Sequence, residues 1–112
     1  MVSYSQLSIY RDSYQLLLEI YQITNKFSRD FKYTLGQDMK RDVLALFRYL
    51  YEANISVEKR KEYINKFLTS FELLKVEMRL CTDLKILSMS KLAQLSLLMD
   101  NISRQAHGWR KI

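Results

Sequence analysis

The side chains that most often perform catalysis are scarce in this sequence. His107 is the only histidine and Cys81 the only cysteine among 112 residues. A di-iron centre in a helical bundle requires two inward-pointing Glu-x-x-His pairs, but the residue three positions before His107 is Arg104. Neither Gly36 nor Gly108 has a second glycine near it, as a phosphate-binding loop would need. We therefore expect no metal centre, no cofactor and no enzymatic activity.

The single cysteine predicts neither a disulfide nor a reactive thiol. Cys81 lies in an apolar stripe, which favours a small buried side chain. A reactive thiol would need exposure and a cationic neighbour, and Arg79 and Lys85 should point elsewhere on the helix. A chain without disulfides is typical of the reducing cytoplasm, and the first residues lack the basic and apolar regions of a signal peptide. We expect a cytoplasmic protein without a membrane-spanning segment.

Lysine and arginine supply the chemistry that remains. They number 18 against 12 acidic residues, which gives a formal net charge of +6. Such an excess favours binding to RNA, DNA or an acidic protein surface. The alternative is a solvated, partly ion-paired surface and, for Arg79, an ion pair with Asp83 one turn further on. The candidate contact residues are Arg29, Lys32, Lys40, Arg41, Arg79, Lys85, Arg104, Arg110 and Lys111.

Long stretches with apolar residues three or four positions apart predict helices as the elements that carry these side chains. Proline is absent and glycine occurs twice, so a many-stranded fold would lack residues for its turns. We expect helices over residues 8–27, 34–54, 57–87 and 88–108, joined by short connectors that place successive helices antiparallel. The predicted fold is an all-α, antiparallel up-and-down four-helix bundle in one domain, residues 1–112.

Side chains at the expected helix ends predict how the helices begin and stop. Thr34 and Gln37 match a capping box. Ser56, and Ser88 or Ser90, are candidate N-caps of the third and fourth helices. Gly108 stands where the fourth helix should stop.

The apolar residues also predict which helix faces enter the core. In the third helix the steps alternate between three and four, as in a heptad seam. Apolar residues off the stripes indicate either a subunit interface or scattered exposure. The expected stripe of the first helix is Tyr10, Tyr14, Leu17, Leu18, Tyr21 and Thr24; the seam is Ile64, Phe67, Phe71, Leu74, Met78 and Cys81; the residues off the stripes are Leu16, Ile20, Tyr49, Tyr51, Leu73 and Leu97.

Up-and-down topology predicts a basic pole at each end of the bundle. One pole would hold Lys26, Arg29, Lys32 and Lys85, and the other would bring Lys59, Arg60 and Lys61 near the end of the fourth helix. Phosphate contacts at either pole would give affinity without reading sequence, and binding would weaken steeply with salt. The rings beside Lys32, which are Phe31 and Tyr33, can either stack on bases or plug the end of the core, and we favour the plug.

Four segments, in order along the chain, match motifs of a known family. Residues 27–36 read FSRDFKYTLG, like a passage Phe-x-x-x-x-(Arg/Lys)-(Phe/Tyr)-Thr-Leu-Gly, and residues 78–87 read MRLCTDLKIL, like a run Leu-Arg-Leu-x-x-Asp-Leu-Lys. The others are residues 52–54 and residues 102–111, where a single Gly-Trp stands in place of Gly-Gly-Trp. Together they resemble the accessory variability determinant (Avd) proteins of diversity-generating retroelements.

The resemblance implies a non-enzymatic partner of a retroelement reverse transcriptase. Such proteins form ring-shaped homopentamers, bind nucleic acid through a basic surface, and are needed for error-prone copying of template RNA into cDNA. A related family, encoded in intervening sequences of bacterial ribosomal RNA, shares the bundle, and its second helix ends in an Asn-Ile-Ala-Glu-Gly-like stretch. Residues 52–56, EANIS, are closer to the Avd pattern. The alternative function is that of a structural bundle whose role is assembly alone.

Overall fold

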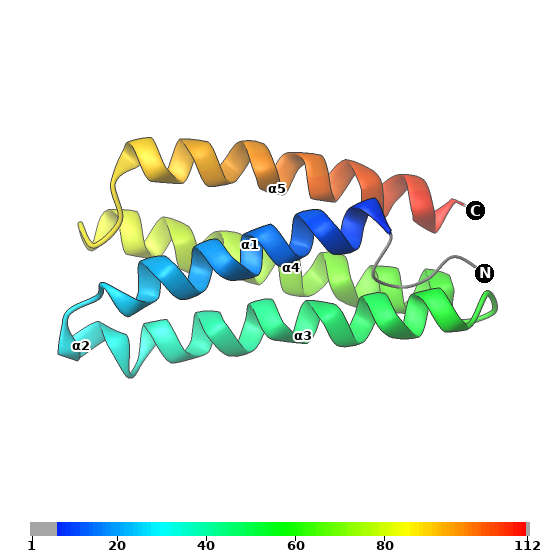
Figure 1. Ribbon diagram of the computed structural model, residues 1–112, viewed down its shortest axis with the longest axis horizontal. Coiled ribbons are helices and arrows are strands. Elements are labelled where there is room, and N and C mark those ends of the chain that lie inside the picture. The colour runs from blue at the N-terminus through cyan, green and yellow to red at the C-terminus, as the bar shows by residue number, and fades with distance from the viewer. Residues whose placement is uncertain (1–6, 112) are drawn as a thin grey trace.

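In the computed structural model, which describes residues 7–111, four long helices lie side by side (Figure 1). They are α1 (Ser8–Asn25), α3 (Leu35–Ile55), α4 (Arg60–Asp83) and α5 (Met89–Arg110). A single turn of helix, α2 (Arg29–Lys32), lies between α1 and α3. The predicted all-α, antiparallel four-helix bundle is confirmed. Residues 1–6, part of the stretch expected to lack a signal peptide, lie outside the described residues, as does residue 112.

The helices pack around the bundle in the order α1, α3, α4, α5, and each long helix runs antiparallel to the next (Figure 1). α2 and the connector from α4 to α5 therefore share one end of the bundle. The connector from α3 to α4 shares the other end with the C-terminal end of α5. Over residues 7–111 there is no helix with the length and apolar character needed to cross a membrane.

Helix α4 stops four residues earlier than expected, at Asp83 rather than at residue 87. Lys85 takes a left-handed conformation with φ of 63°. The backbone N–H of Ile86 donates to the carbonyl of Cys81, and that of Lys85 donates to the carbonyl of Thr82. This is the hydrogen-bond pattern of a Schellman motif, in which the left-handed position is usually glycine. Because a lysine occupies this position here, no glycine marks the end of the helix in the sequence.

The predicted caps are partly correct. The Ser88 hydroxyl accepts a hydrogen bond from the backbone N–H of Lys91 at 3.0 Å, so that N-cap is confirmed. The capping box at Thr34 is wrong, because its hydroxyl donates to the carbonyl of Asp30, one turn back. The Ser56 hydroxyl accepts from the backbone N–H of Lys59, and α4 begins after it, at Arg60.

Gly108 does not end the fourth helix, because α5 continues to Arg110. Gly36 has a packing role instead. A Cβ atom there would lie 3.2 Å from the carbonyl oxygen of Phe31 and 3.5 Å from the Phe27 ring. Gly36 thus lets the first turn of α3 approach α1 and α2 closely, which gives a physical reason for glycine in the Thr-Leu-Gly segment.

The predicted core face of α1 is correct at Thr24, which is buried, and in part at Leu17, which packs partly buried against the core, but it is wrong elsewhere. Leu16 and Ile20, which we expected off the stripe, are completely buried, whereas Tyr14, Leu18 and Tyr21 are exposed. Burial of a tyrosine requires a partner for its hydroxyl, whereas leucine and isoleucine bury no polar atom. The small polar residue Ser13 is also buried on this face, and a serine gives no apolar signal in the sequence.

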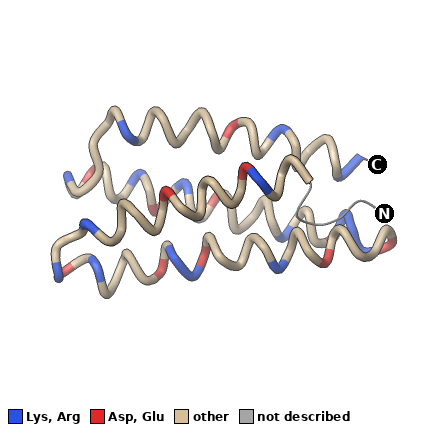
Figure 2. Tube along the Cα trace, viewed as in Figure 1, with Lys and Arg blue, Asp and Glu red and all other residues tan. Residues whose placement is uncertain are grey.

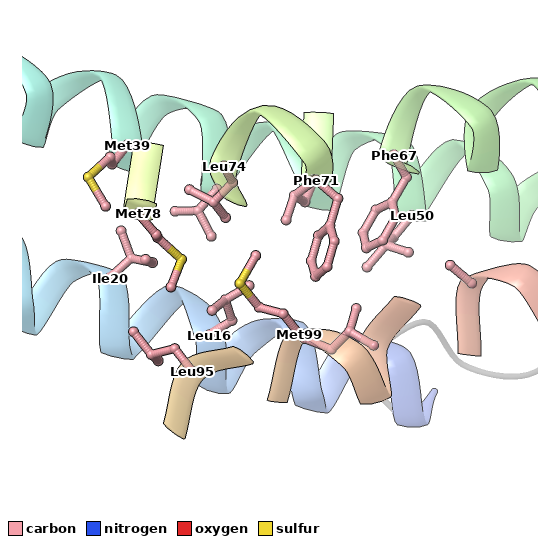
Figure 3. Close-up of a cluster of buried hydrophobic side chains, with 14 of the residues drawn as sticks. Leu16, Ile20, Met39, Leu50, Phe67, Phe71, Leu74, Met78, Leu95 and Met99 are labelled. Atoms are coloured by element: carbon pink, nitrogen blue, oxygen red, sulfur yellow. The ribbon is translucent and has the colours of Figure 1, made fainter. Parts of the chain in front are cut away.

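The heptad seam of α4 is confirmed, since all of its predicted members are buried. Phe67 and Phe71 stack with ring centroids 5.5 Å apart, and Met78 meets Ile20 and Leu16 in the centre of the bundle (Figure 3). Of the other residues expected off the stripes, Tyr49 packs partly buried against the core. The rest remain exposed, and they are Tyr51, Leu73 and Leu97.

Cys81 is buried, as predicted for a small apolar side chain. Its Sγ lies 3.5 Å from the Sδ atom of Met39 on α3. Burial, and then the nearby carboxyl of Glu77, raise the pKa of the thiol to about 11. The thiolate, which is the reactive form, is therefore disfavoured.

Candidate nucleic-acid interface

Lys and Arg residues of two segments, the one around α2 and the connector from α4 to α5, lie at the same end of the bundle (Figure 2). We call Lys26, Arg29, Lys32 and Lys85 the end cluster. Three of them are exposed, and Lys32 is half-buried with its Nζ 5.9 Å from the centroid of the Tyr33 ring. Two acidic residues, Asp30 and Asp83, belong to the same end, so cations remain in excess. The four residues thus lie at the same end of the bundle, as the up-and-down topology predicted.

The rings that flank Lys32 have different surroundings. Phe31 is half-buried and packs against the core, as a plug would. Tyr33 is 61% exposed and does not plug anything. The favoured interpretation was therefore right for Phe31 and wrong for Tyr33.

The two candidate cations of α3 differ in their pairing. Arg41 lies 3.3 Å from a carboxylate oxygen of Asp38 and 3.5 Å from one of Asp42. Its charge is therefore largely balanced within the helix. Lys40 instead places its Nζ 5.2 Å from the centroid of the Tyr21 ring on α1. Lys40 is the better candidate for an external anion.

Arg79 is exposed and, within residues 7–111, forms no ion pair with Asp83, so the intrahelical pair is not its explanation. It lines a shallow groove of about 260 Å³ between α4 and α5, together with Lys75 and Asp100. Lys75 is paired with Glu72 at 3.3 Å. The groove lies along the side of the bundle, apart from the end cluster.

At the opposite pole, Arg60 and Arg110 make contacts that stabilise the fold. Arg110 donates from Nη1 to the side-chain oxygen of Asn65 at 2.9 Å, which ties α5 to α4. Arg60 lies over the Trp109 ring at 5.1 Å and donates from Nε to the carbonyl of Ala53. The exposed cations at this end include Lys59, Lys61, Arg104 and Lys111. Because Arg60 and Arg110 are engaged, and the exposed Glu58 and Glu62 flank Lys59 and Lys61, this pole is the weaker candidate surface.

His107 takes part in the same structural contacts. Its Nδ1 lies 3.2 Å from Nη2 of Arg110 on the surface of α5. Residues 7–111 hold no group of three or more His, Cys, Asp or Glu side chains able to bind a metal ion.

A buried pair of carboxyl groups between α3 and α4 was not predicted. Glu77 is only 8% exposed, and while both carboxyl groups are ionised its Oε1, like Oδ2 of Asp42, is buried without a hydrogen-bond donor among the described residues. Burial, then a hydrogen bond with Asp42 and the charges of Asp42 and Asp38, raise the pKa of Glu77 to about 8, against the opposing charge of Arg41. A glutamate within a charged amphipathic helix ordinarily lies at the surface, so the sequence carried no signal for it.

A comparison with protein families completes this description. A model of the bAvd-like family matches residues 2–112, which is almost the whole chain. No curated protein and no solved structure was found to match. The family match agrees with the motif segments, of which the Thr-Leu-Gly passage lies at the close contact of α3 with α1 and α2. The chain belongs to the bAvd-like family, and the resemblance to Avd proteins is thereby confirmed.

Proposed function

We propose that this protein is a non-enzymatic accessory factor of a diversity-generating retroelement. It binds the RNA template or its cDNA through the end cluster and docks on the retroelement reverse transcriptase. The proposal extends to a homopentamer, by resemblance to other Avd proteins. The observation that carries it is membership of the bAvd-like family, together with the gathering at one end of the bundle of cations that form no ion pair within residues 7–111.

The charges support the end cluster over the basic positions that already form ion pairs. Phosphate groups need cations that are free to approach them, and ion-paired side chains contribute little. Arg41, Lys75 and Lys91 are already paired with carboxylates. The end cluster brings together cations from two connectors that are far apart in the sequence, and a phosphate chain can follow such a surface.

Neutralising the end cluster tests the nucleic-acid part of the proposal. With Lys26, Arg29, Lys32 and Lys85 all changed to glutamine, RNA affinity at low salt should fall by at least about tenfold, because up to four phosphate contacts are lost. The matched control removes the same number of charges at the opposite pole, by changing Lys59, Lys61, Arg104 and Lys111 to glutamine. Fluorescence anisotropy with a labelled RNA measures both variants. A larger loss in the control would place the interface at the other pole.

Two further measurements address the partners. Light scattering at micromolar concentration reports the oligomeric state, and a strictly monomeric protein would contradict the pentamer. A neighbouring reverse-transcriptase gene with a template repeat supports the retroelement role, whereas a location inside a ribosomal RNA gene supports a purely structural bundle.

A further inference from the structure

α1 and α3 carry a group of aromatic rings along their contact, of which Tyr14 and Tyr21 are exposed and Tyr10 and Phe47 are half-buried. We call Tyr10, Tyr14, Tyr21 and Phe47 the aromatic stripe. Tyr14 and Tyr21 are 46% and 41% exposed, although both lie in the middle of a well-packed helix. The ring of Tyr14 stacks on that of Tyr10 at 6.2 Å between centroids, and Phe47 meets both rings edge-on at 5.4 and 6.4 Å. The rings of Tyr10, Tyr14 and Phe47 therefore support one another.

The surroundings of the stripe carry positive charge. Lys40 lies over Tyr21, and α1 leads from Tyr21 directly to Lys26 of the end cluster. Both acidic residues of α1 are engaged on the side that faces α5. Asp12 accepts hydrogen bonds from Asn101 and Gln105, and Glu19 lies 2.6 Å from the ammonium group of Lys91. Carboxylates of α1 are thus drawn away from the stripe, which suits a polyanionic ligand.

We propose that the aromatic stripe is a stacking surface for the unpaired bases of single-stranded nucleic acid. This inference rests on the proposed function and deepens it, because it names the strand state of the ligand. Aromatic side chains beside a basic surface bind single strands by base stacking, independently of sequence. Tyr14 and Tyr21 lie seven residues apart, about 10 Å along the helix, so a short extended strand can reach both. A duplex hides the faces of its bases and gains nothing from the stripe.

The test replaces the rings but keeps apolar side chains, with Tyr14→Leu and Tyr21→Leu combined. Affinity for a labelled thymidine oligonucleotide of about 15 nucleotides should fall about tenfold or more, because stacking is lost. Affinity for a duplex of the same length should stay within about twofold, since phosphate contacts are unchanged. The double Tyr→Phe variant should bind as the wild type does. Tyr63→Leu is the matched control, because Tyr63 also lies under a lysine, Lys66 at 4.8 Å, but on α4.

Three results would overturn the inference. If the leucine variant binds the single strand as tightly as the wild type does, stacking is wrong while the proposed function stands. If light scattering shows that the leucine change alters the molar mass, the stripe is a contact between copies of the chain. If the wild type binds neither oligonucleotide, the inference and the proposed function fail together. Circular dichroism confirms folding, and Tyr21→Leu alone decides the question if the double variant unfolds.

Discussion

Replacing Leu16 with alanine is expected to lower the free energy of unfolding by about 2–5 kcal/mol, because the change leaves a cavity in a closely packed core. Leu16 is completely buried, and it lies among Ile20, Met78 and Met99 in the centre of the bundle (Figure 3). Urea unfolding followed by circular dichroism measures the difference.

Leu18→Ala is the matched control, because it removes the same atoms two residues along the same helix. Leu18 is 40% exposed, so its loss should cost less than about 1 kcal/mol. If Leu18→Ala proved the more costly change, α1 would face the core with the tyrosine stripe that the sequence predicted.

Glu77→Gln is expected to raise the free energy of unfolding at about pH 8 by roughly 2–4 kcal/mol. The folded state raises the pKa of Glu77 from 4.5 to about 8, through burial and the neighbouring Asp42 and Asp38, with Arg41 opposing them. Between these values the folded protein holds a proton that the unfolded chain has released. The contribution of Glu77 is therefore fully present below about pH 4.5 and is lost as the pH rises through about 8. Glutamine keeps the buried hydrogen bond to Asp42 and cannot ionise.

Unfolding at several pH values between about 5 and 8 checks this prediction. The advantage of the glutamine variant over the wild type should grow with pH across that range. Glu72→Gln is the control, because Glu72 lies on the same helix with its side chain 71% exposed. A glutamine variant whose advantage is constant with pH would contradict the raised pKa of Glu77 in the folded state.

The fold class and the α4 seam could be predicted because the three- and four-residue spacing of apolar residues is the dominant pattern there. In α4 the residues at three- and four-residue spacing are apolar, and few other apolar residues compete with them as far as Phe71. In α1 two apolar faces compete, and the sequence pattern alone does not weigh the cost of burying tyrosine hydroxyls. The larger aromatic residues therefore predicted the wrong face.

The sequence predicted where the basic residues of the candidate site lie, but not which basic residues form ion pairs with carboxylates. Up-and-down topology was enough to bring Lys26, Arg29, Lys32 and Lys85 to one end. Which cations are neutralised depends on side-chain geometry, as for Arg41 between Asp38 and Asp42. The stop at Lys85 and the buried Glu77 were missed for a related reason, since each residue type ordinarily occupies a different environment.

The central claim, that this bundle binds nucleic acid by electrostatic contacts at the end cluster, is tested most directly by the salt dependence of RNA binding. The affinity of the wild-type protein for a labelled single-stranded RNA is measured by fluorescence anisotropy across a salt series. Engagement of the four cations predicts that the logarithm of the association constant falls linearly with the logarithm of salt concentration, with a slope of about −3. No binding at low ionic strength, or an affinity that does not change with salt, would contradict the account.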